Sequence, residues 1–89
     1  MRIHALVSGR VQGVWFREST RQSAEKHGVA GWVRNLRDGR VEVLVEGEPS
    51  AVQAVIDFVR EGPTHARVSG IEIRDEPTPD AGLTGFHVR

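Results

Sequence analysis

Two glycines near the N-terminus separate a segment with strand periodicity from a segment with helix periodicity, and this junction constrains the fold most. The stretch reads Gly9-Arg10-Val11-Gln12-Gly13-Val14-Trp15-Phe16-Arg17. Glycine adopts positive φ without steric cost, so the chain can turn sharply there. The first amide groups of the helix that follows have no intrahelical partners and carry the positive end of the helix dipole. The junction therefore predicts a cradle for an anion.

Two arginines add positive charge to this junction. Arg10 and Arg17 lie near the helix start, where the dipole favours Asp or Glu instead. A bound phosphate or carboxylate would make this placement favourable, and the planar guanidinium of Arg17 can bind two of its oxygens. The site must be local, because the twelve basic and twelve acidic residues balance. A general nucleic-acid surface would show a basic excess, so we expect no nucleic-acid partner.

Length and composition favour one small globular domain over residues 1–89. No apolar run approaches the roughly 18 residues of a membrane helix, and the N-terminus lacks the apolar core of a signal peptide. We therefore expect no membrane partner and a cytoplasmic location. The absence of cysteine excludes disulfides and a cysteine nucleophile, and the four scattered histidines do not suggest a metal site.

The first half of the chain shows a strand, a helix and a hairpin. Residues 2–8 alternate in polarity as a strand does, and residues 16–27 have helical spacing that ends at Gly28. Residues 30–36 and 40–47 predict two strands joined by Asp38-Gly39, a strong hairpin signal. We expect Trp32 to lie in the core, and we expect Glu42 and Glu46 to lie on a solvated face.

The second half begins with the strongest helical pattern. Pro49 opens residues 49–61, whose apolar residues recur at helical spacing, and Gly62-Pro63 ends that helix. Residues 68–74 predict a strand, residues 77–85 a loop, and residues 86–89 a short terminal strand.

This order predicts an α+β fold of the ferredoxin-like βαββαβ type. Two helices would cover one face of a mostly antiparallel sheet of four to five strands. If the first strand, first helix and second strand form a right-handed crossover, both strands end at the same edge of the sheet. We therefore expect the glycine loop, Arg17 and Asn35 to lie near one another.

The two longest motifs resemble the acylphosphatase family. They read G-R-V-Q-G-V-W-F-R at residues 9–17 and G-W-V-R-N-L-R-D-G-R-V-E at residues 31–42, and Gly62-Pro63 and residues 66–68 are also similar. The resemblance covers nearly the whole chain and implies the same sandwich fold. It also implies hydrolysis of acyl phosphates to a carboxylate and inorganic phosphate.

The resemblance implies a role for each matching position. The phosphate-binding loop would comprise Arg10, Val11, Gln12, Gly13 and Val14. Arg17 would grip the phosphate, and Asn35 would position the attacking water. No cofactor or metal is implied, a monomer is expected, and inorganic phosphate would be both product and competitive inhibitor. Trp15 is either a packing anchor for the loop or one wall of the substrate site.

Binding without catalysis is the alternative class of function, since a fold does not settle function. An RNA-binding sandwich would expose aromatic residues on its sheet for base stacking, whereas residues 41–46 offer valine and glutamate there. A catalytically silent relative that binds an acyl phosphate stays open as an alternative to the enzyme.

Overall fold

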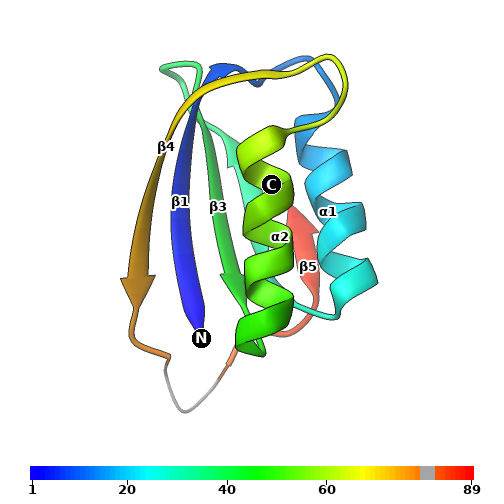
Figure 1. Cartoon of the computed structure of the whole chain (residues 1–89), viewed down its shortest axis with the longest axis vertical. Helices are drawn as coiled ribbons and strands as arrows, with labels where there is room; N and C mark the ends of the chain where they lie inside the picture. Colours follow the sequence, from blue (N-terminus) through cyan, green and yellow to red (C-terminus); the bar gives the residue numbers. More distant parts are fainter. Residues whose placement is uncertain (79–81) are drawn as a thin grey trace.

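The computed structural model describes residues 1–78 and 82–89 and shows two helices packed on one sheet (Figure 1). Part of the loop predicted at residues 77–85 therefore lies outside the described residues. In chain order the elements are β1 (Arg2–Arg10), α1 (Phe16–His27), β2 (Ala30–Asn35), β3 (Val41–Glu46), α2 (Pro49–Glu61), β4 (Arg67–Glu76) and β5 (Phe86–Val88).

The sheet has the strand order β4-β1-β3-β2-β5, and both helices cover the same face of it (Figure 1). All neighbouring strands are antiparallel except β2 and β5, which are parallel. The predicted ferredoxin-like α+β sandwich is confirmed. Neither helix of the described chain combines the length and apolar content needed to cross a membrane.

The core lies between the sheet and the helices and consists mainly of valine. Strands β1, β3 and β2 alternate so that every second side chain faces the helices, and α2 buries the apolar stripe expected from its spacing. The fully buried side chains of these four elements include Val7, Val43, Val33 and Val55. Burial of each such side chain contributes about 1.5–3 kcal/mol, so the sheet and helices hold each other in place.

The other face of the sheet differs from the prediction in two ways. Trp32 lies on this face rather than in the core, and the guanidinium carbons of Arg34 and Arg89 lie 5.2 and 4.8 Å from its ring centroid. Glu46 is buried rather than solvated, because its carboxylate accepts a hydrogen bond from the Leu83 amide at 2.7 Å. Its other oxygen lies 3.7 Å from Nε of Arg2, in a contact that partly offsets the cost of burying this charge.

Gly9 allows β4 to approach β1 closely just before the glycine loop. Its φ is +123°, and the strand register shifts between Ser8 and Gly9 as in a β-bulge. A Cβ atom at Gly9 would overlap the carbonyl oxygen of Arg67. Pairing continues beyond the bulge to Arg10 and Arg67, so β1 is longer than the sequence pattern predicts. The other end of β4 is also longer than predicted, because Asp75 and Glu76 pair with Ile3 and Arg2.

Gly9→Ala should therefore destabilise the fold by about 2–4 kcal/mol, because it adds both a clash and backbone strain. Gly70→Ala is the matched control. Gly70 faces Ser8 across the same strand pair, has open space around its Cα and does not have a positive φ. In urea unfolding, the free energy of unfolding of the control should change by no more than about 0.5 kcal/mol. Equal stabilities of the two variants would contradict this interpretation of the bulge.

Candidate active site

The loop between β1 and α1 has a backbone suited to anion binding. Gly13 and Trp15 both adopt left-handed conformations, with φ of +74° and +65°, whereas Val14 between them does not. This alternation turns successive N–H groups toward one side and forms a concave anion site. The side chains of Val11 and Val14 are buried in the core, so the backbone of the loop is held firmly.

The start of α1 adds further free donors to this loop. The helix begins after Trp15, whose carbonyl accepts the hydrogen bond from the Ser19 amide at 2.9 Å, and no side chain caps this end. The amides of the first helical turn therefore have no partner within the helix. Together with the positive end of the dipole, they favour a negative ligand at this place.

The side chain of Gln12 fastens the loop to the turn between β2 and β3. Its Nε2 donates to the carbonyl oxygens of Leu36 and Arg40 at 2.7 and 2.9 Å. The Leu36 amide also donates to the Arg40 carbonyl, which closes the turn. The loop and the end of β2 therefore form one connected unit, although β3 separates β1 from β2 in the sheet.

A cavity of about 360 Å³ opens between these two elements. It is lined by Val11, Gly13, Trp15, Phe16, Arg17, Glu18, Asn35 and Val88. The structure thus brings Arg17 from the first turn of α1 together with Asn35 from the end of β2. This agrees with the expectation that both strands end at one edge of the sheet.

Arg17 and Asn35 both retain unused hydrogen-bonding capacity. Nη1 of Arg17 donates to the carbonyl oxygen of Arg89 at 3.1 Å, which uses one of the five N–H donors of a guanidinium group. Oδ1 of Asn35 is buried and has no hydrogen-bond partner among the described residues. A buried amide oxygen normally has a donor, so this atom can accept a hydrogen bond from a water or another polar group in the cavity.

The seven predicted site residues divide into two groups. Four of them line the cavity, namely Val11, Gly13, Arg17 and Asn35. The other three do not line it. Arg10 is exposed at the end of β1, Gln12 bonds the hairpin turn, and Val14 packs in the core.

Phe16, Glu18 and Val88 line the cavity but were not predicted as site residues. Phe16 and Glu18 adjoin Arg17, so their positions in the first helical turn could have indicated them. Val88 carries no such signal, because its place follows from the parallel pairing of Val33 with Val88 in β2 and β5.

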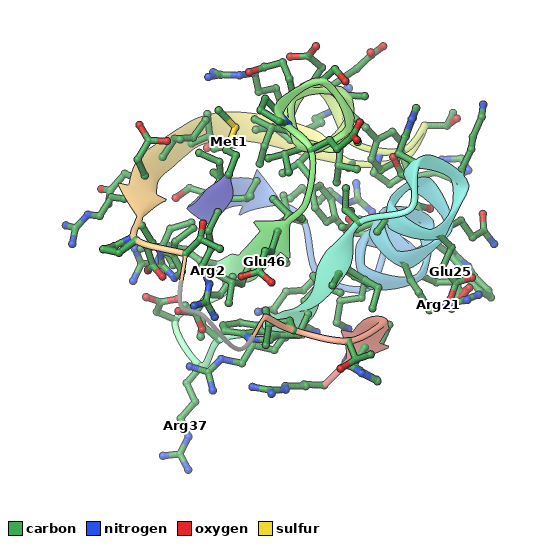
Figure 2. All side chains as sticks on the ribbon, turned by 90° about the horizontal axis from the view of Figure 1, so that it is seen from below. Met1, Arg2, Arg21, Glu25, Arg37 and Glu46 are labelled. Atoms are coloured by element: carbon green, nitrogen blue, oxygen red, sulfur yellow. The ribbon has the colours of Figure 1, made fainter. Side chains whose placement is uncertain are left out.

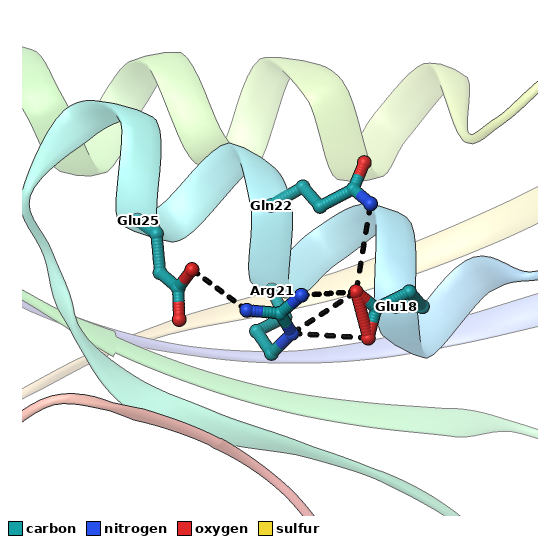
Figure 3. A network of polar contacts seen from close by, with 4 residues as sticks. All are labelled: Glu18, Arg21, Gln22 and Glu25. Carbon is teal, nitrogen blue, oxygen red and sulfur yellow. Dashed lines mark hydrogen bonds and ion pairs between the residues drawn. The ribbon is translucent and has the colours of Figure 1, made fainter.

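The carboxylate of Glu18 is occupied by a network on the outer surface of α1 (Figure 3). Arg21 donates from Nε to Glu18 at 3.0 Å and from Nη1 to Glu25 at 2.7 Å, and Gln22 also contacts Glu18. The hydrogen bonds from Arg21 hold the pKa of Glu18 below its usual range, despite the opposing effect of desolvation. A carboxylate with a lowered pKa is a weaker base, so Glu18 is poorly suited to accept a proton at neutral pH.

Metal-ligating side chains do not cluster within residues 1–78 and 82–89, where no group of three or more His, Cys, Asp or Glu could hold an ion. The donors that face the cavity are instead cationic or neutral. These donors are of the kind that bind an oxyanion.

The fold and the loop together define a ferredoxin-like sandwich with a candidate anion site at a strand–helix junction. The acylphosphatase family model matches residues 3–88. An acylphosphatase from Rubrobacter xylanophilus is 57% identical over 99% of this chain and 79% of its own length. One from Pseudomonas paraeruginosa is 56% identical over 98% of this chain and 93% of its own. The chain belongs to the acylphosphatase family and is a hydrolase of that family.

A solved structure gives the same result for the fold. The crystal structure of acylphosphatase from Bacillus subtilis superimposes with a TM-score of 0.93 at 36% identity. The match covers 99% of this chain and 97% of that one. The agreement extends over both helices and the complete sheet.

Gln12→Ala should destabilise the protein by about 1–3 kcal/mol, because two carbonyl groups at the turn lose their shared donor. Its rate of acyl phosphate hydrolysis should also fall, since the loop is no longer fixed to the end of β2. Gln53→Ala is the control, because Gln53 bonds Asp57 on the exposed surface of α2. The free energy of unfolding in urea should fall more in Gln12→Ala than in Gln53→Ala. Similar losses of stability in both variants would refute a special role of Gln12.

The lowered pKa of Glu18 predicts a stabilising contribution that depends on pH. A carboxyl group whose pKa is lower in the folded state stabilises the fold above its unfolded pKa, and this stabilisation is lost as pH falls through the folded pKa. Arg21→Gln should therefore raise the pKa of Glu18, as followed by NMR of its carboxyl carbon. An unchanged titration of Glu18 in that variant would contradict the role given to Arg21.

Proposed function

We propose that this chain hydrolyses the carboxyl–phosphate anhydride of acyl phosphates by direct attack of water on phosphorus. The observation that carries the mechanism is the shared cavity, which joins the donors of Arg17 to the unpartnered oxygen of Asn35. Arg17 and the loop amides would hold the phosphoryl group, and Asn35 would hold the water. Residues 1–89 would act as one domain.

Stabilisation of charge is the main task in phosphoryl transfer. Negative charge is spread over the equatorial oxygens of phosphorus in the transition state, and positioning with fixed donors supplies most of the catalysis. Arg17 offers a planar set of donors, and the amides near Gly13 and Trp15 offer a rigid concave set. Removal of one such donor from comparable sites costs about 3–4 kcal/mol, or a hundredfold to a thousandfold in rate.

The water needs orientation more than activation by a base. The leaving group is a carboxylate with a pKa near 4, so protonation by a general acid is not required. Oδ1 of Asn35 can accept a hydrogen bond from the water and so direct its lone pair toward phosphorus. The proton would pass to a phosphate oxygen of the substrate, because Glu18 is engaged by Arg21.

Inorganic phosphate, the product, would occupy the same donors and inhibit competitively. We also infer a monomer, since Met1, Trp15 and Val88 are the large apolar side chains that the described residues expose. Analytical ultracentrifugation tests this state. A cytoplasmic location is part of the proposal and is tested by fractionation of the source cells.

Arg17→Ala should lose both hydrolysis and inhibition by phosphate, whereas Asn35→Ala should lose turnover and retain phosphate binding. Each rate should fall at least about a hundredfold on acetyl phosphate. Arg37→Ala is the control, because its side chain extends from the hairpin turn into solvent (Figure 2). Full activity of either site variant would overturn the mechanism, and phosphate binding without turnover in the unmodified chain would favour the silent binding module.

Removal of divalent metals should leave the rate unchanged, because every proposed interaction uses protein donors. The measurement compares steady-state hydrolysis of acetyl phosphate before and after dialysis against a chelator. A loss of activity that added Mg²⁺ restores would show that the proposed donor set is incomplete.

A further inference from the structure

Exposed apolar side chains gather at the mouth of the candidate active site. Trp15 is 76% exposed and Val88 is 41% exposed, and both line the cavity that holds Arg17 and Asn35. Met1 is the other large apolar side chain with comparable exposure in the described part of the chain, and it does not line this cavity. The cavity therefore has a polar part and an apolar part.

The backbone conformation at position 15 does not favour a tryptophan. Its φ of +65° makes it the one non-glycine residue with positive φ among those described, and bulky side chains are strained in that region. Glycine would adopt the same backbone without that cost, as Gly13 does two residues earlier. The high exposure of Trp15 also excludes the packing role considered for it from the sequence.

We propose that Trp15, together with Val88, binds the acyl group and selects substrates with an aromatic or large apolar acyl group. This inference rests on the proposed function, since it places the phosphoryl group at Arg17 and the loop amides. The acyl group joined to that phosphoryl group would then extend past these two side chains, which both line the cavity. A benzoyl group can stack on the indole ring, whereas an acetyl group offers a single methyl group.

The expected effect lies mainly in substrate binding. The ring contacts a part of the substrate away from the phosphorus, so it stabilises the bound substrate and the transition state to a similar extent. Loss of such a contact raises KM and leaves kcat nearly unchanged. A substitution that distorted the phosphate-binding loop would instead lower kcat for every acyl phosphate.

Kinetics with benzoyl phosphate and acetyl phosphate test this selectivity. The unmodified enzyme should favour benzoyl phosphate in kcat/KM by about tenfold or more. Trp15→Ala should remove most of that preference by raising KM for benzoyl phosphate, and Trp15→Phe should retain most of it. Thermal unfolding followed by circular dichroism verifies that both variants are folded. Equal changes on the two substrates in Trp15→Ala would overturn the proposal.

Binding of two non-hydrolysable phosphonates to the unmodified chain separates this inference from the proposed function. Phenacylphosphonate and acetonylphosphonate carry the same anionic group and differ in the group that should meet Trp15. Calorimetry should give about tenfold tighter binding of the phenacyl compound. Equal affinities would overturn the inference even if the chain hydrolyses acyl phosphates. Unequal affinities without any hydrolysis would support the apolar subsite and refute the proposed function.

Discussion

The candidate site depends on one side-chain amide, that of Gln12. Its two hydrogen bonds join the glycine loop to the turn after β2, although β1 and β2 each pair with β3 and not with each other. Apart from this bridge, the loop is held by β1 before it, by α1 after it and by its buried valines. The separation between the loop and Asn35 is therefore fixed both by the pairing of β1 and β2 with β3 and by this contact outside the strand ladder. Any catalytic scheme that uses both elements relies on it.

The side chains and the backbone of the loop have different roles. Val11 and Val14 bury their side chains in the core, which leaves the backbone amides to form the anion site. In the proposed mechanism the positive charge comes from Arg17 on the next element, and the amide oxygen that would hold the water comes from Asn35 on β2. Donors that packing and hydrogen bonds hold in place need little reorganisation during the reaction.

Features encoded locally were predicted well, and features set by distant segments were not. The bounds of α1 and α2 were predicted correctly because apolar spacing, Pro49 and the terminal glycines act within each helix. The added residues of β4 pair with the two ends of β1, Arg67 past the bulge at Gly9 and Asp75 and Glu76 beside the start of β1, and the pattern of β4 itself contains neither contact. Trp32 and Glu46 were misplaced for the same reason, since contacts from residues 83 and 89 cover them. Arg17 and Asn35 came from motifs, whereas Val88 required the register of β5.

The most direct test of the central claim is a crystal structure of the protein with inorganic phosphate. The claim is that the loop and the end of β2 form a single site. We predict one phosphate that contacts the amides of the glycine loop and the guanidinium of Arg17, with an ordered water between the anion and Oδ1 of Asn35. A phosphate bound elsewhere, or bound at the loop with Asn35 facing away from it, would contradict the account.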